Sequence, residues 1–175
     1  WAFEQDDIYS PNYLDRGYSA GVPMGGDLTE APNNTAPSFM IAAVKDPNGA
    51  NLDRVQVVKG WLDKKGKLHE KVYDVAWSGH RKIDTESGKL PAVGNTVDLE
   101  SATYKNTIGT ASLATVWLDP DFDRKERAFY YVRVLEIPVP RWTTYDAAYF
   151  DVEIPEGVSA SVQDRAYTSP IWFTP

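Results

Sequence analysis

The chain has 175 residues, a formal net charge of −7 and no cysteine, which excludes disulfides and thiolate metal sites. The charges are dispersed, whereas a surface that binds nucleic acid needs a basic patch, so we expect no nucleic-acid partner. No apolar run approaches the length of a membrane-spanning helix, so we also expect no membrane span. An aromatic fraction of 13% favours a β-rich protein, because rings pack well on pleated surfaces.

Residues 1–37 are expected to form an irregular extension. A single helical turn is predicted over residues 12–17, with Asn12 as its N-cap. Residues 21–28 form a glycine-rich loop that lacks the preceding strand and the following Lys-Ser/Thr of a phosphate-binding loop. Its glycines either permit close approach of another domain or a ligand, or form turns before the first strand. The sequence leaves both interpretations open.

Residues 38–175 are typical of short strands separated by turns. The turn signal Asp63-Lys64-Lys65-Gly66 predicts a hairpin between strands at 54–62 and 67–77. A central strand is predicted at 126–136, because aromatic and β-branched residues dominate it and alternate between two faces. Further strands are expected at 38–45, 96–103, 114–118 and 169–174, with a helical turn at 124–127 and a short helix capped by Thr143 or Thr144. About seven strands favour an all-β, immunoglobulin-like β-sandwich with long loops.

The start of the central strand, Glu126-Arg127-Ala128-Phe129-Tyr130-Tyr131-Val132, resembles strand F of immunoglobulin-like sandwiches. In those domains a tyrosine hydroxyl reaches back to a backbone group at the corner before the strand. The resemblance gives this role to Tyr130 and places Val132 in a core position that a cysteine often holds. We therefore expect Tyr130 to be buried between two layers of sheet.

Two patterns invite a catalytic or metal-binding interpretation. Asp119-x-Asp121-x-Asp123 has the opening spacing of a calcium loop, but Arg124 stands where glycine is needed and Tyr130 where glutamate is needed. Asp and Pro also suit a turn, and we favour that interpretation. His69 and His80 are the two histidines, and we expect both to be surface residues without a catalytic role.

The segment that follows the central strand is the most suggestive binding loop. Prolines stiffen its start, Arg141 can hold an anionic group, and Trp142 can stack on a ring. The alternative is that Trp142 and Tyr145 cover the open end of the core, with Arg141 paired to a carboxylate. Both interpretations remain open from the sequence.

Several segments together resemble a known family. They are residues 21–28, 46–53, 57–61, 71–79, 93–98, 119–123, 127–136, 140–143 and 165–172. The series resembles the C-terminal portion of the DUF3604 family and extends over nearly the whole chain. Members of that family resemble metal-dependent hydrolases of the PHP (polymerase and histidinol phosphatase) type. The resemblance implies an N-terminal catalytic barrel whose His and Asp residues hold divalent metals, and hydrolysis of phosphate or sulfate esters, including aryl sulfates.

The resemblance carries no catalytic residue and no metal ligand onto this chain, because the His- and Asp-rich metal motifs are not among its residues. The chain begins Trp1-Ala2-Phe3 without an initiator Met, so we expect it to be part of a longer protein or a processed product. Many members of the family look exported, so the resemblance implies a periplasmic or secreted protein. In this hypothesis residues 38–175 are an accessory β-sandwich, and residues 1–37 contact the catalytic domain of the same chain. The candidates for contacts to the substrate are Asp27, Arg141, Trp142 and Tyr145.

The second hypothesis is a stand-alone module that binds carbohydrate or protein. It predicts an exposed planar row of rings on a sheet face, from Trp61, Trp77 or Trp117. Burial of those tryptophans, with exposed apolar surface near residues 1–30, would instead favour a domain interface.

Overall fold

The structure is a computed structural model that describes residues 1, 3–29, 31–32 and 35–175. The helical elements are η1 (Gln5–Tyr9), a 3-10 helix, and the short α-helices α1 (Tyr13–Ala20) and α2 (Trp142–Phe150). The strands are β1 (Asp27–Leu28), β2 (Ser38–Val44), β3 (Leu52–Leu62), β4 (Leu68–Trp77), β5 (Ser112–Leu118), β6 (Arg127–Glu136), β7 (Val139–Pro140), β8 (Ser161–Val162), β9 (Arg165–Tyr167) and β10 (Ile171–Phe173). The β-rich class expected from the composition is confirmed.

The larger sheet has the order β1-β10-β6-β3-β4, and β9 also pairs with β6. β6 is the central strand, as its alternation predicts, and it pairs antiparallel with β3 along nearly its whole length. On its other side β9 and β10 follow one another along the same edge. Thr168 connects them, because its hydroxyl accepts a hydrogen bond from the Val132 amide and its own amide donates to the Val132 carbonyl. β1 completes the edge by running parallel to β10.

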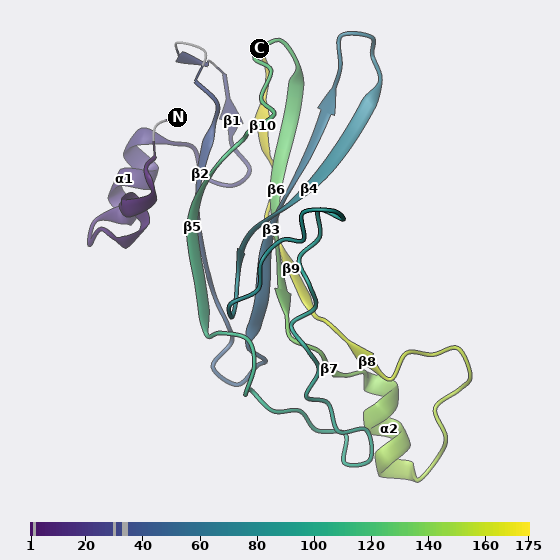
Figure 1. Ribbon diagram of the computed structural model, residues 1–175. Coiled ribbons are helices and arrows are strands. Elements are labelled where there is room, and N and C mark those ends of the chain that lie inside the picture. Colours follow the sequence, from purple (N-terminus) through teal and green to yellow (C-terminus); the bar gives the residue numbers. More distant parts are fainter. Residues whose placement is uncertain (2, 30, 33–34) are drawn as a thin grey trace.

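A second, smaller sheet packs on one face of the larger one. It consists of β2 and β5, which pair antiparallel over seven residues each (Figure 1). The main core lies between the two layers, where Phe39 and Ile41 of β2 meet Val55 and Val57 of β3. Tyr130 of β6 is buried in the same core, as expected.

The predicted hairpin joins β3 and β4. The Asp63 carboxylate accepts hydrogen bonds from the amides of Lys65 and Lys67, which closes the turn. Gly66 adopts a φ of +77°, a conformation that glycine tolerates and other residues rarely adopt. The turn chemistry is local, which is why the sequence alone predicts it.

The N-terminal segment is more regular than its composition indicates. η1 and α1 lie on the outer side of β2 and β5 (Figure 1). α1 extends from Tyr13 to Ala20, well beyond the single predicted turn, and Asn12 stands at its N-cap without a side-chain hydrogen bond.

The glycine-rich loop forms a turn that leads into β1. Gly25 has a φ of +90°, and its amide donates to the Pro170 carbonyl. The Trp172 amide donates to the Gly26 carbonyl, which seats the loop against β10. Of the two interpretations of these glycines, the turn is therefore the one that the described residues form.

A smaller body lies at the end of the molecule away from both termini (Figure 1). β7, β8 and α2 belong to it, and it has its own apolar cluster of Ala50, Ile137 and Val139. Residues 96–103 border this body but do not form the predicted strand, because a single bridge joins Asp98 to Thr103. The Asp98 carboxylate instead accepts the amides of two following residues, which makes a tight turn.

Two helical predictions also need correction. α2 begins at Trp142, with Arg141 at the N-cap, rather than after a threonine cap. Thr144 is buried inside the helix, and its hydroxyl donates to the Ala160 carbonyl, so tertiary contact replaces capping. Residues 124–127 do not form the predicted helical turn. They form a turn, in which the Glu126 amide donates to the Asp123 carbonyl, and then the start of β6.

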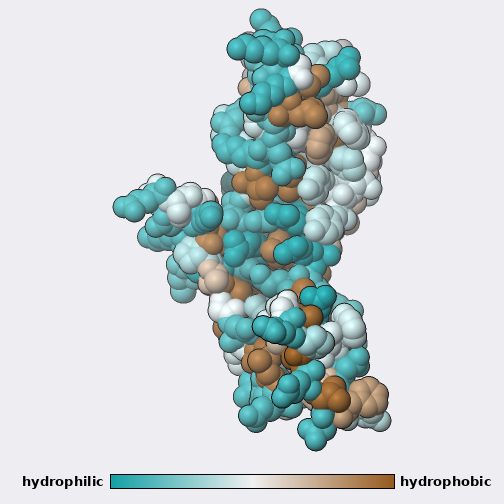
Figure 2. Space-filling view, turned by 90° about the vertical axis from the view of Figure 1, so that its right-hand side faces the viewer, coloured by the Kyte–Doolittle hydropathy of each residue, from teal (hydrophilic) through white to brown (hydrophobic). Residues whose placement is uncertain are grey.

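We call the other side of the larger sheet the outer face. Within the described residues no second sheet packs on it beside β3 and β6. Figure 2 looks onto this side of the molecule, and apolar and intermediate residues are mixed with hydrophilic ones over its upper half. No helix in the described part of the chain combines the length and the apolar character needed to cross a membrane.

Candidate functional site

The four predicted substrate contacts lie in two separate places. Arg141, Trp142 and Tyr145 lie at the start of α2, whereas Asp27 lies in β1. These two elements are near opposite ends of the molecule (Figure 1). The structure therefore brings the three residues of α2 together and separates Asp27 from them.

The start of α2 is an exposed aromatic cluster next to one arginine. Trp142 is 65% exposed and Tyr145 is 46% exposed, so neither covers the open end of the core. The backbone of Arg141 fixes the helix start, because its amide donates to the Ala160 carbonyl and its carbonyl accepts the Thr144 amide. Its side chain forms no ion pair with any described residue. The cluster can therefore offer a ring surface and a cation to a partner.

Asp27 is an exposed residue at the edge of the larger sheet. Its backbone lies opposite Trp172 of β10, so the strand pairing sets its position. Among the described residues its carboxylate has no partner. It follows the exposed Met24 by three residues, and because the next residue, Leu28, is buried in the core, the Asp27 side chain points to the outer face beside Trp172.

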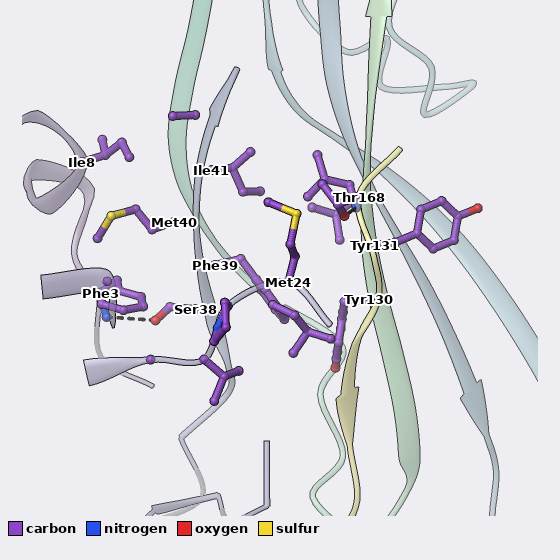
Figure 3. A pocket seen from close by; sticks show the side chains of 18 of the residues that line it. Phe3, Ile8, Met24, Ser38, Phe39, Met40, Ile41, Tyr130, Tyr131 and Thr168 are labelled. Atoms are coloured by element: carbon purple, nitrogen blue, oxygen red, sulfur yellow. Dashed lines mark hydrogen bonds between the residues drawn. The ribbon is translucent and has the colours of Figure 1, made fainter. Parts of the chain in front are cut away.

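An apolar pocket of about 450 Å³ opens between the two layers beside the N-terminal segment. Figure 3 shows Phe39 and Ile41 of β2 facing Tyr130 of β6 across it, with Met24 of the glycine-rich loop between them. The Tyr131 ring points away from the pocket, as alternation along a strand requires (Figure 3). None of the described lining residues is Asp, Glu, His, Lys or Arg. The pocket therefore suits an apolar group and offers no acid–base pair.

A buried ion pair stabilises the corner before β6. The Lys59 Nζ lies 2.6 Å from Asp119 Oδ2, and both side chains are almost completely buried. The Tyr130 hydroxyl donates to the same carboxylate oxygen at 2.7 Å. Burial and the negative charge of Asp119 raise the pKa of Tyr130, so the phenol stays a donor. Tyr130 therefore anchors the corner, but through a carboxylate instead of the expected backbone group.

The two acids that follow are paired as well. Asp121 accepts hydrogen bonds from Lys71 and from the Tyr73 hydroxyl at 2.5 and 2.6 Å, and both lower the pKa of Asp121. Asp123 lies 2.7 Å from the Lys64 Nζ. Each carboxylate faces a different cation, so the three acids do not converge on one point.

The described residues do not fit the divalent metal that the family resemblance implies. They contain no group of three or more His, Cys, Asp or Glu side chains that could hold a metal ion. His69 is engaged at the hairpin, where its Nε2 lies 2.8 Å from Asp63 Oδ2 and its ring stacks on Trp61. That hydrogen bond lowers the pKa of Asp63. His80 is exposed in the loop after β4.

A row of rings that the sequence does not predict lies on the outer face. Trp61, Trp77 and Trp117, from which a platform was expected, are half-buried. The rings that follow one another on the outer face are those of Trp172, Phe129, Tyr131 and Tyr167. The alternation of β6 placed Phe129 and Tyr131 on one side, but nothing local in the sequence predicts that β9 and β10 flank them.

These observations define a β-rich domain with two layers, an apolar pocket and separate exposed aromatic surfaces. A family described as "Protein of unknown function (DUF3604)" matches residues 1–175. The chain therefore belongs to the DUF3604 family. No curated protein and no solved structure matches it.

Proposed function

We propose that this chain is an accessory β-domain of a bacterial metal-dependent hydrolase of phosphate or sulfate esters. The reactive centre then lies in an N-terminal catalytic domain of PHP type, which holds the divalent metals. The support for this proposal is the membership of the chain in the DUF3604 family, together with the resemblance of members of that family to such hydrolases.

The two layers correspond, in this proposal, to an immunoglobulin-like sandwich. The neighbours β10-β6-β3-β4 take the places of strands G, F, C and C′, and the pair β2-β5 takes the places of B and E. The buried Tyr130 near the start of β6 supports this correspondence. The connection between F and G is enlarged by β7, α2 and β8.

The accessory role rests on an exposed apolar surface around the pocket. Leu14, Tyr18 and Met24 line the pocket and are largely exposed, and Tyr9 is exposed in the adjacent η1. A contiguous apolar surface of this kind usually marks an interaction site. The tryptophans of the predicted platform are half-buried rather than exposed, which supports a domain interface over that particular platform. We call this area the docking surface.

The docking surface and the α2 cluster cannot both face one substrate pocket. Asp27 follows Met24 of the docking surface by three residues, but it alternates with the buried Leu28 and pairs with Trp172, so its side chain points to the outer face. α2 lies at the far end of the molecule (Figure 1). Because β1 is the edge strand and follows the docking surface directly in the chain, we propose Asp27 as the one of the four that can reach the catalytic domain, from the edge of the sheet. Arg141, Trp142 and Tyr145 form a separate surface.

The test compares the full-length protein with the 175-residue chain. We expect the full-length protein to cleave an aryl sulfate or an aryl phosphate with a divalent metal present and to lose activity in a chelator. The chain alone should neither hydrolyse these esters nor bind the metal. Hydrolysis by the chain alone would overturn the assignment of the chemistry to another domain.

A charge on the docking surface should weaken the contact with the catalytic domain. In the full-length protein, Leu14→Glu should lower the thermal midpoint, because desolvating a carboxylate in an apolar interface is costly. Tyr149→Glu, on an exposed residue of α2, is the matched control. Equal thermal midpoints for the two variants would contradict the docking surface.

A further inference from the structure

The outer face presents arginines and rings in one line along β6. Side chains alternate along a strand, so Arg127, Phe129, Tyr131 and Arg133 all project from this face. At about 3.3 Å per residue, the line from Arg127 to Arg133 is about 20 Å long. It begins and ends with a cation and has an aromatic middle.

Neighbouring strands widen the aromatic middle. The Trp172 ring of β10 lies 5.3 Å from the Phe129 ring, and the Tyr167 ring of β9 lies 6.2 Å from the Tyr131 ring, measured between centres. Trp172 is 48% exposed and Tyr167 is 57% exposed. Phe129 and Tyr131, which lie between them, are half-buried. The four rings therefore form one continuous row in which the two outer rings are the more exposed.

Gly60 allows the middle of this surface to lie close to the sheet. A Cβ at Gly60 would be 2.3 Å from the Cζ atom of Phe129, so only a glycine leaves room for the ring. The Phe129 and Tyr131 rings are within 9° of parallel. Trp172 is tilted by 51° against Phe129 and Tyr167 by 44° against Tyr131, so the row is parallel in its middle and turns at both ends.

Arg133 is held in place through its Nε nitrogen. Its Nε donates to Gln56 Oε1 at 2.8 Å, and Gln56 Nε2 donates to Asp74 Oδ1 at 2.8 Å. No described residue binds either terminal nitrogen of Arg133. A guanidinium fixed through Nε presents two parallel donors that match a carboxylate or sulfate.

Two further arginines on this face lack a partner among the described residues. They are Arg127, at the start of β6, and Arg165, two residues before Tyr167 in β9. Asp27, Glu70 and Asp74 lie on the same face, and Asp74 is bound by Arg54 and Gln56. With Arg54 counted, the four arginines of this face outnumber its three acids, in a chain with a net charge of −7. Charge complementarity therefore favours an anionic ligand that also has flat apolar faces.

We propose that the outer face binds an acidic polysaccharide. Successive sugar rings stack their apolar faces on Trp172, Phe129, Tyr131 and Tyr167. The carboxylate or sulfate groups of the polysaccharide are held by Arg127, Arg133 and Arg165. This binding does not depend on the hydrolase proposal, because the outer face lies on the side of the larger sheet away from the docking surface (Figure 1).

Other ligands fit less well. Single-stranded nucleic acid stacks on rings too, but its affinity depends on neutralising many phosphates, and this acidic chain offers a few cations. A neutral polysaccharide would leave the fixed donors of Arg133 without an acceptor. Both are useful comparison ligands for this reason.

The test measures binding of the 175-residue chain to four polymers by calorimetry. Polygalacturonate carries carboxylates, chondroitin sulfate carries sulfates and carboxylates, a linear β-glucan is neutral, and an oligothymidylate represents nucleic acid. We expect binding to at least one acidic polysaccharide, weaker binding as salt rises, and little binding to the other two. Absence of binding to both acidic polysaccharides, or equal binding to the β-glucan or the oligothymidylate, would overturn the proposal.

Single substitutions test whether the polysaccharide binds at the outer face. Tyr131→Ala and Arg165→Gln should each weaken binding by at least about tenfold, because each removes a stacking face or an anion contact. Tyr149→Ala and Lys105→Gln, which remove an exposed ring and an exposed cation elsewhere, should leave binding unchanged. Arg165 is exposed and has no partner among the described residues, so its loss tests the anion contact in a folded chain. Unchanged binding in both site variants would show that the ligand lies elsewhere and would contradict the proposal.

Discussion

Tyr130 connects the core to a buried charge. Its hydroxyl is a donor to Asp119, so Tyr130→Phe leaves that buried carboxylate with one hydrogen bond fewer. We expect the free energy of unfolding to fall by about 1–3 kcal/mol, measured by urea denaturation. Tyr131→Phe is the control, since its ring points away from the core and its loss of a hydroxyl should change stability by about 0.5 kcal/mol or less. Equal losses in the two variants would contradict an anchoring role.

Removing the Lys59 amine should lower the stability of the fold more than removing the Tyr130 hydroxyl does. Lys59→Met leaves Asp119 buried without its cation, and we expect a loss of about 3–5 kcal/mol in the free energy of unfolding. The double variant Lys59→Met with Asp119→Asn should recover part of that loss, because no buried charge is left unpaired. Strictly additive effects in this cycle would show that the two residues do not interact.

At the scale of elements, the contact between β3 and β6 depends on Gly60. Gly60→Ala places a methyl group on the Phe129 ring, which must move, and we expect a loss of about 1–3 kcal/mol in the free energy of unfolding. Gly17→Ala is the matched control, because Gly17 lies in α1 with nothing within 4 Å of an added Cβ. There we expect a gain of about 0.5–1 kcal/mol. A loss at Gly17 and none at Gly60 would contradict the packing described.

The elements that the sequence predicts well are those with a local cause. β6 and the β3–β4 hairpin follow from alternation and from the Asp63 turn, and both are confirmed. α2 begins before the expected threonine cap, because the Thr144 hydroxyl binds Ala160 rather than the helix backbone. The strand expected at 96–103 is missing for a local reason. The Asp98 carboxylate binds the amides of residues that follow it, and these hydrogen bonds compete with strand pairing.

The candidate surfaces were less predictable because distant segments build them. The pocket combines the glycine-rich loop with β2 and β6, and the outer face sets Trp172 beside Phe129. No periodicity within a strand indicates which strands become neighbours. The segment after β6 was identified from its residue types alone, and its exposure agrees with a binding role that stays a prediction.

At the scale of the whole molecule, stability should fall in acid. Hydrogen bonds lower the pKa of Asp121, Asp63, Asp84, Asp98 and Asp123 in the folded chain. A carboxyl whose pKa is lowered in the folded chain stabilises the fold at a pH above its pKa in the unfolded chain, which is about 3.9. That stabilisation is lost as the pH falls through the pKa of the folded chain. We expect the thermal midpoint to drop steeply below about pH 4. Asp121→Asn should make that drop shallower, and an unchanged slope would contradict the contribution of Asp121.

Stability should fall in alkali as well. The pKa values of Tyr130 and Tyr73 are raised, mainly by burial, above the unfolded value of about 10. The contribution of these two tyrosines to the free energy of unfolding is present below about pH 10 and is lost as the pH rises above that value. We expect absorbance titration to show exposed tyrosines such as Tyr9 and Tyr18 ionising first, with the last tyrosines ionising together with unfolding. Ionisation of all tyrosines in a folded chain would contradict their burial.

Hydrogen–deuterium exchange tests most directly whether the chain docks through its N-terminal surface and leaves its outer face open. The comparison is between the full-length protein and the 175-residue chain. We predict slower exchange over residues 9–26 in the full-length protein, and equal exchange over residues 127–136 and 165–173. Protection of the outer face in the full-length protein, with none over residues 9–26, would contradict the account.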